Sequence, residues 1–154
     1  MKDSQVAKMR AFNRFYTAHL GVLNRKYLNG EFSLPEIRVL YAIYTTEGIM
    51  AEGVAAGGIT ANDIVLLLHI DKSYLSKILI RFGRMKFLTK KISTDDGRAY
   101  HLHLTAAGRK KVELYDRLSN EFVRQMLVQL SEKDCEELVD CMQRITGILE
   151  RVRM

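Results

Sequence analysis

Basic side chains are concentrated in one part of this 154-residue chain. Residues 71–111 hold eleven of the 24 lysines and arginines but only three of the 18 aspartates and glutamates. Lysine and arginine neutralise phosphate groups, and both donate hydrogen bonds to the edges of bases. The concentration therefore indicates a surface that meets a polyanion such as nucleic acid. On charge alone, a solvated basic face is the competing interpretation.

The spacing within this stretch predicts a helix from Lys72 to about Lys86 with two different faces. One face is apolar and holds Leu75, Ile78, Leu79, Phe82 and Met85. The opposite face is small or basic except for Ile80, and no acid occurs between Lys72 and Lys91. A helix that enters the major groove needs small residues for close approach and cations that reach bases or phosphates. We therefore predict DNA contacts from Lys72, Ser73, Ser76, Lys77, Arg81 and Arg84.

A β-hairpin is predicted directly after this helix. Two alternating runs, residues 88–93 and 99–105, are joined by the polar segment 94–98. Arg98 at the tip would enter the flanking minor groove, whose narrow and negative channel suits a single guanidinium. Asp96 stands two residues earlier and can orient that guanidinium through a bidentate pair.

The elements that must position these residues are predicted from apolar periodicity and from helix caps. A first helix is expected over residues 6–27, ended by Gly30. A capping box at Ser33 and Glu36 begins a second helix. Four glycines within residues 48–58 then predict a loop.

A helix-turn-helix is predicted from the next two caps. Thr60 opens a short helix that runs to Leu68, and Asp71 caps the basic helix after a break at residues 69–70. Two helices joined by so short a turn are typical of this motif. The chain after the hairpin is predicted to be helical, with a further capping box at residues 131–134.

Residues 96–108, DGRAYHLHLTAAG, resemble the wing signature of the MarR family of transcription regulators. The family pattern is Asp-x-Arg, three residues, an aliphatic residue, one residue, Leu-Thr, and a glycine after two more. Residues 71–79 are similar to the start of the family's recognition helix, and residues 34–40 are similar to its second helix. Residues 72–76 are closest to a branch whose members also carry an acetyltransferase. No second domain is expected in this chain, and no enzymatic activity is expected.

The resemblance implies a mainly α fold with a small β-hairpin wing, a winged helix-turn-helix with N- and C-terminal dimerisation helices. Residues 1–154 would form a single domain, with the winged helix-turn-helix lobe at 30–108 and dimerisation helices at 1–29 and 109–154. It also implies a homodimer that binds pseudo-palindromic double-stranded DNA, usually as a repressor that responds to a small-molecule effector. Tyr16 and His19 lie on the first helix, which borders the effector pocket in this family. Core packing is the competing interpretation of both residues.

Two features depart from the family pattern. His69 stands in the turn where glycine is usual, and a left-handed backbone there is more strained without glycine. The glycine-rich segment 48–58 is longer than the family needs and could reshape the neighbouring partner surface.

Other functions remain as alternatives. His101 and His103 share one face of a predicted strand and could begin a metal site, although wing histidines near DNA are favoured and no metal is predicted. Cys135 and Cys141 are predicted to be buried structural cysteines, although an intersubunit pair would make a thiol-responsive sensor. A winged-helix protein-interaction module without DNA binding is a third possibility. No nucleophile–base pair or carboxylate pair indicates an enzyme, and no cofactor is expected.

Composition places the chain among globular proteins, with 47% hydrophobic and 27% charged residues. The longest apolar run, residues 64–68, is too short to span a bilayer. The first five residues include an acid and no apolar core, so no signal peptide is expected. Two cysteines in a chain of this length suggest a reducing compartment, and a cytoplasmic location is predicted.

Overall fold

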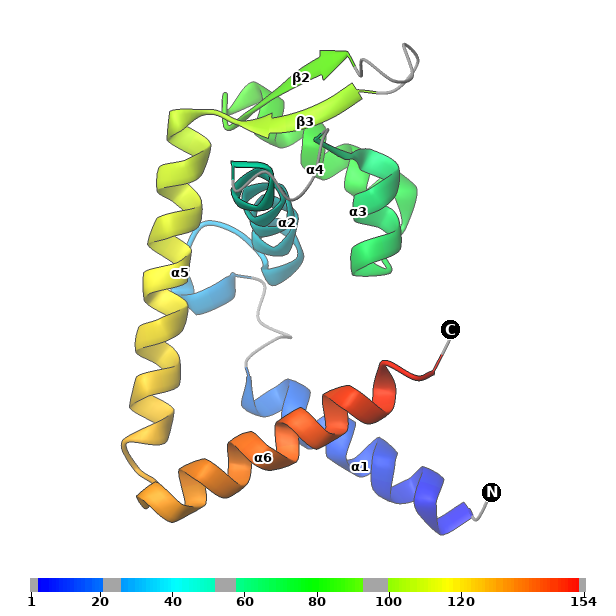
Figure 1. Cartoon of the computed structure of the whole chain (residues 1–154), viewed down its shortest axis with the longest axis vertical. Helices are drawn as coiled ribbons and strands as arrows, with labels where there is room; N and C mark the ends of the chain where they lie inside the picture. The colour runs from blue at the N-terminus through cyan, green and yellow to red at the C-terminus, as the bar shows by residue number, and fades with distance from the viewer. Residues whose placement is uncertain (1–2, 21–25, 52–57, 93–99, 153–154) are drawn as a thin grey trace. The chain divides into compact units, whose positions relative to one another are not determined.

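A computed structural model describes residues 3–20, 26–51, 58–92 and 100–152 (Figure 1). The chain divides into two compact units, Met1–Asp116 and Arg117–Met154. The described elements are α1 (Asp3–His19), the 3-10 turn η1 (Tyr27–Asn29), α2 (Leu34–Ala51), β1 (Ile59–Thr60), α3 (Ala61–Leu68), α4 (Lys72–Arg84), β2 (Leu88–Ile92), β3 (Tyr100–Leu104), α5 (Ala106–Leu127) and α6 (Glu132–Leu149).

The first unit contains an antiparallel three-stranded sheet in the order β1-β3-β2. Leu88 pairs with Leu104 and Ile92 pairs with Tyr100, so β2 and β3 form the predicted hairpin within one residue of the expected bounds. Ile59 pairs with Leu102, which adds β1 to the other edge of β3. The mainly helical composition and the hairpin confirm the predicted fold class.

The core of this unit joins α2, α3, α4, the sheet and the first turns of α5. The predicted apolar face of α4 is buried at Leu75, Ile78, Leu79 and Phe82. Each of these elements contributes at least one fully enclosed side chain to the core, and Phe32, just before α2, contributes another. The fully enclosed side chains are Phe32, Val39, Leu40, Ile43, Ile64, Leu75, Phe82, Leu102 and Val112. Burial on this scale gives the lobe, here the part of the chain from η1 to Asp116, a hydrophobic core of its own.

The prediction of one helix over residues 6–27 is wrong at its C-terminal end. α1 ends at His19, and Tyr27 belongs to the separate turn η1. Leu28 has a left-handed backbone (φ 51°), and the Tyr27 N–H donates to the Phe32 carbonyl at 2.7 Å instead of to a preceding helical turn. Gly30 is required by close packing, because a Cβ at this position would lie 2.2 Å from the Tyr115 hydroxyl.

The predicted loop at residues 48–58 is also partly wrong. α2 continues to Ala51, and β1 begins at Ile59, directly after the segment. The capping box at Ser33 starts α2 as predicted, since one Glu36 carboxylate oxygen accepts from the Ser33 N–H at 2.8 Å and from its hydroxyl at 2.9 Å. Gly48 is therefore accommodated inside a helix, where glycine is unfavourable but not forbidden. Residues 52–57 of the predicted loop lie outside the described residues.

α5 begins at the base of the wing and is held closely to the lobe. Thr105 donates from its N–H to the Phe87 carbonyl at 3.0 Å and from its hydroxyl to the Lys86 carbonyl at 2.7 Å. A Cβ on Gly108 would lie 2.1 Å from the Phe87 carbonyl oxygen, which explains physically why a glycine is needed there.

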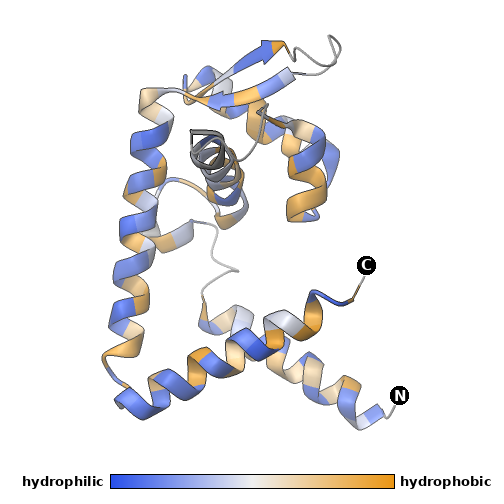
Figure 2. Cartoon of the chain, in the orientation of Figure 1, coloured by the Kyte–Doolittle hydropathy of each residue, from blue (hydrophilic) through white to orange (hydrophobic). Residues whose placement is uncertain are grey.

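The second unit comprises the end of α5 and α6. Ser131 caps α6 as predicted, its hydroxyl oxygen accepting from the Asp134 N–H at 3.1 Å. No residue of α6 is buried, and the same is true of the described residues of α1. Hydrophobic residues are distributed along both helices, as the ribbon coloured by hydropathy shows (Figure 2).

Candidate nucleic-acid interface

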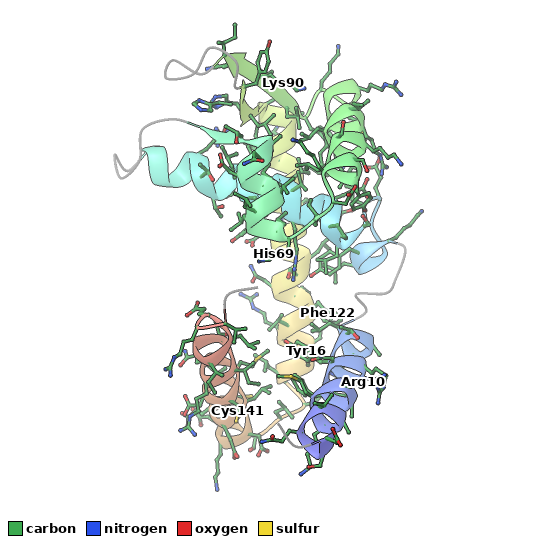
Figure 3. All side chains as sticks on the ribbon, turned by 90° about the vertical axis from the view of Figure 1, so that its right-hand side faces the viewer. Arg10, Tyr16, His69, Lys90, Phe122 and Cys141 are labelled. Carbon is green, nitrogen blue, oxygen red and sulfur yellow. The ribbon has the colours of Figure 1, made fainter. Side chains whose placement is uncertain are left out.

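The turn between α3 and α4 sets the position of the basic helix. α3 begins with the predicted capping box, in which Thr60 and Asp63 exchange hydrogen bonds. His69 then adopts a left-handed backbone (φ 49°, ψ 42°) in the turn (Figure 3), where the sequence departs from glycine. The chain accepts a conformation that is strained for a non-glycine residue, and the helix-turn-helix forms as predicted.

Asp71 caps α4. One carboxylate oxygen accepts from the backbone N–H groups of Ser73 and Tyr74, each at 2.9 Å, and from the Ser73 hydroxyl. The Ser73 hydroxyl is the main reason that the pKa of Asp71 lies below its ordinary value, with the Tyr74 N–H as the next contribution. Asp71 is thus held ionised at the helix N-terminus, and the Ser73 hydroxyl proton is committed to it.

The outer face of α4 is exposed as predicted. Its exposed residues are Lys72, Ser73, Ser76, Lys77, Ile80, Arg81 and Arg84. An open hollow on this face is lined by Lys77, Ile80, Arg81, Arg84 and Met85. Lys77 and Arg84 have no ion-pair partner among the described residues, so both side chains are available to an anion from outside.

Arg81 differs from its neighbours on this face. Its Nη1 atom pairs with Oε1 of Glu36, and the centre of its guanidinium lies 4.9 Å from the centroid of the Phe32 ring. Glu36 is a buried charged residue at the start of α2. Arg81, which the sequence predicts to contact DNA, therefore has interaction partners within the lobe.

The wing is only partly described. Lys90 and Lys91 lie exposed on β2, and Figure 3 labels Lys90 on the hairpin. The tip, which carries Asp96 and Arg98, lies outside the described residues, so the prediction of a minor-groove contact stays a prediction.

The two histidines of β3 have partners within the lobe. The His101 Nδ1 atom accepts from the Gly58 N–H at 3.1 Å, which joins the start of β1 to the wing. His103 lies 3.4 Å from Oε1 of Glu47, and the described part of the chain contains no cluster of three or more potential metal ligands. Both side chains are half-buried, so they brace the base of the wing.

Sequence reasoning missed Glu47. This residue lies on α2 and accepts from the Leu104 N–H at 3.0 Å, while its other oxygen lies 2.7 Å from Nη2 of Arg109. One carboxylate thus links α2, β3 and α5. No local pattern could reveal it, because its partners lie more than fifty residues along the chain.

Glu36 was recognised for its cap and not for its pairing with Arg81. The capping signal lies within four residues, whereas Arg81 is 45 residues away. The tertiary fold alone brings α2 and α4 together at this point.

The described terminal helices expose apolar faces. On α1 these are Val6, Met9, Phe12 and Phe15, and on α6 they include Val139, Met142, Ile145 and Ile148. Within α1, Tyr16 stacks on Phe12 at 5.5 Å and His19 stacks on Phe15 at 5.6 Å between ring centroids. Figure 3 labels Tyr16 on this helix. These contacts lie within one helix, so the predicted effector role of Tyr16 and His19 stays a prediction.

Cys135 and Cys141 are both free thiols. Cys135 is half-buried and its Sγ lies 3.7 Å from the Leu127 carbonyl oxygen, while Cys141 is exposed. The prediction that both cysteines are buried is therefore wrong, because α6 has no buried residue in the described chain. None of the helices in the described part of the chain combines the length and apolar content needed to cross a bilayer.

No protein-family model matches the chain, and no curated protein sequence matches it. The chain does match solved structures. The chain is similar to MepR, a transcription regulator of the Staphylococcus aureus multidrug efflux pump MepA, with a TM-score of 0.61, 19% identity, and coverage of 97% of this chain and 99% of that one. It is also similar to the S. aureus MepR–DNA complex, with a TM-score of 0.60, 20% identity and coverage of 97% and 98%.

A third structure, Streptococcus pneumoniae FabT in complex with DNA, has a TM-score of 0.70 at 18% identity and covers 98% of this chain and 100% of that one. MepR and FabT are MarR-family winged-helix transcription regulators, the family that the wing motif resembles. At these identities the likeness establishes the fold. The predicted winged helix-turn-helix is therefore confirmed.

Proposed function

We propose that this chain is a sequence-specific, double-stranded DNA-binding transcription regulator. The observation that carries the proposal is the outer face of α4, which is exposed, contains no acid and follows a tight turn after α3. Lys72, Ser73, Ser76, Lys77 and Arg84 would line the major groove. Arg81 is predicted for the same face but is paired with Glu36.

Charge favours DNA over a protein partner for this surface. An ordinary protein-interaction surface carries charges of both signs, or has few charged residues at its centre. Here cations surround a small-residue stripe near the helix N-terminus, which suits a phosphate backbone beside a base edge. MepR and FabT, which share this fold, have been solved with DNA.

The proposed regulator acts as a homodimer on a pseudo-palindromic operator. The apolar faces of α1 and α6 support dimerisation, because an amphipathic helix gains stability by burying its apolar side. Two recognition helices related by a two-fold axis would meet half-sites about one helical turn apart. Such a regulator would work where the genome lies, in the cytoplasm.

Ligand-responsive repression is the proposed mode of control. An effector that prefers one spacing of the two recognition helices would shift the population between DNA-binding and released states. One structure of MepR holds ethidium bromide, with a TM-score of 0.54 and 21% identity to this chain. Tyr16 and His19 are the proposed effector-pocket residues.

The wing is proposed to add a minor-groove contact through Arg98, oriented by Asp96. Arg98→Ala should raise the Kd for the specific site about tenfold or more, in line with the loss of one base-groove contact. Full affinity in this variant would rule out the wing contact while leaving the α4 proposal intact.

The test is a selection of sequences from a random duplex library, followed by fluorescence-anisotropy titration of the selected and random duplexes at several salt concentrations. Tight binding to the selected duplex above a weaker, salt-dependent background is expected. Lys77→Ala should weaken binding, whereas the matched control Lys133→Ala, on α6, should not. Failure of the library to yield any enriched sequence, with no salt-dependent binding, would overturn the proposal in favour of a protein-interaction module.

A further inference from the structure

The side chain of Arg81 is held from two directions. Its guanidinium pairs with Glu36 at the start of α2 and lies over the Phe32 ring, whose centroid is 4.9 Å away. Phe32 is fully buried and packs edge-to-face on Phe82 of α4, with ring centroids 5.6 Å apart. Arg81 therefore links α4 to Phe32 and Glu36 at the start of α2.

Glu36 makes this arrangement difficult to release. Its side chain is 11% exposed, and its carboxylate accepts from the Ser33 N–H and hydroxyl as well as from Arg81. If Arg81 turned toward a phosphate, a nearly buried carboxylate would lose its counter-charge, which is strongly unfavourable. The same carboxylate would also repel a phosphate that approached Arg81 in place.

Lys77 and Arg84 provide the contrast. Both are exposed on the same face of α4, and neither has an ion-pair partner among the described residues. The three cations line one hollow, yet among the described residues only Arg81 of the three forms an ion pair within 4 Å.

We propose that Arg81 is a positioning residue, which Glu36 uses to hold the recognition helix against α2, and that Arg81 does not neutralise a DNA phosphate. The inference rests on the proposed function for its DNA readout. In this proposal Lys77 and Arg84 contact DNA, whereas Arg81 fixes the position of α4. Glu36 thereby combines two tasks, capping α2 and placing α4.

The first experiment measures the salt dependence of binding to the selected duplex. Each phosphate contact contributes about 0.9 to the slope of log K against log salt, so Lys77→Gln should reduce the slope of a dimer by about two. Arg81→Gln should leave the slope unchanged. It should lower affinity for the selected duplex about tenfold with little change on random DNA, because a misplaced helix loses base contacts first.

Equal losses of slope in Arg81→Gln and Lys77→Gln would overturn the inference, since Arg81 would then be a phosphate contact. Arg81→Lys provides a further check. Lysine keeps a charge beside Glu36, so this variant should recover part of the discrimination between selected and random DNA.

The second experiment requires no DNA. Urea unfolding of Glu36→Gln, Arg81→Gln and the double variant forms a double-mutant cycle. Coupling of about tenfold in the unfolding equilibrium constant is expected, with the double variant more stable than the sum of the single changes predicts. Additive effects would overturn the inference. A wild-type protein without salt-dependent DNA binding would overturn the proposed function, while the cycle would still decide the role of the pair.

Discussion

The lobe and the terminal helices differ in how far their apolar side chains are buried. The described part of the lobe encloses seventeen hydrophobic residues, whereas no described residue of α1 or α6 is buried. Yet α6 is as amphipathic in sequence as α4 and α5 of the lobe, and Ser131 caps it. Local sequence signals thus suffice to form a helix, while burial of its apolar face depends on the segments that pack against it. The lobe carries its own core, whereas the apolar faces of α1 and α6 are exposed in the described chain.

The largest effect should come from emptying the lobe core. Phe82 is fully buried, so Phe82→Ala should lower the free energy of unfolding by about 3–5 kcal/mol through lost transfer energy and a cavity. Urea unfolding measures the change. The matched comparison is Phe15→Ala on α1, where the side chain is 64% exposed. With both variants diluted until the chain is monomeric, the effect of Phe15→Ala should stay within about 0.5 kcal/mol. Similar losses in both variants would erase the distinction between the two regions.

The apolar face of α6 should matter for assembly. Ile145→Glu places a charge where an interface is proposed, and each lost isoleucine contact is worth about 1.5–3 kcal/mol. The dimer dissociation constant should therefore rise at least tenfold by sedimentation velocity across a concentration series. Gln143→Glu introduces the same charge elsewhere on α6 and should leave the dimer intact. Unchanged association in Ile145→Glu would exclude this face from the interface.

A smaller effect is expected from the junction between the lobe and α5. The buried Tyr115 hydroxyl accepts from the Glu31 N–H at 2.7 Å and from the Phe32 N–H at 3.1 Å. Tyr115→Phe leaves both donors without this acceptor and should cost about 1–3 kcal/mol in unfolding free energy. Tyr100→Phe removes an exposed hydroxyl and serves as the control. Equal stability of Tyr115→Phe and wild type would show that the hydroxyl does not secure α5.

The smallest effect concerns the cap of α4 and is seen only at low pH. The pKa of Asp71 lies below its ordinary value of 3.8 because of the Ser73 hydroxyl and the Tyr74 N–H. A carboxyl with a lowered folded-state pKa stabilises the fold above its unfolded pKa, and that stability is lost as the pH falls through the folded value. Asp71→Asn keeps a capping oxygen but does not titrate.

Unfolding measured between pH 6 and pH 2 should therefore show a shallower loss of stability in Asp71→Asn than in wild type below about pH 4. Asp140→Asn, on α6, is the control carboxylate. Parallel pH profiles for Asp71→Asn and wild type would show that the cap hydrogen bonds do not favour the ionised form.

Local hydrogen bonds explain why much of the helix pattern was predictable. The caps at Thr60, Asp71 and Ser131 each involve partners within three residues, so the residue types and their spacing already specify them. The hairpin was predictable for the same reason, because alternation and a short polar turn are local properties. The error at Tyr27 lies where long-range contacts override such signals, because the Tyr27 N–H donates to the Phe32 carbonyl and Gly30 packs against Tyr115.

Long-range contacts account for the features of the candidate site that were not predicted from the sequence. The pairing of Arg81 with Glu36 spans 45 residues, and the Glu47 carboxylate accepts from a backbone N–H 57 residues away. Neither pair has a local spacing. The sequence could therefore predict that Arg81 lies on the outer face of α4, but not that it forms an ion pair with Glu36. The short strand β1 escaped prediction for a similar reason, since its two residues become a strand only through pairing with β3.

The helix-turn-helix, the hairpin after it and the acid-free face of α4 follow from residue types and spacing, because caps, periodicity and charge act over a few residues. The ion pair of Arg81, the role of Glu47 at the base of the wing and the need for glycine at positions 30 and 108 follow only from the folded chain. These depend on distances between segments far apart in the chain. Such distances exist only once the hydrophobic core has brought the segments together.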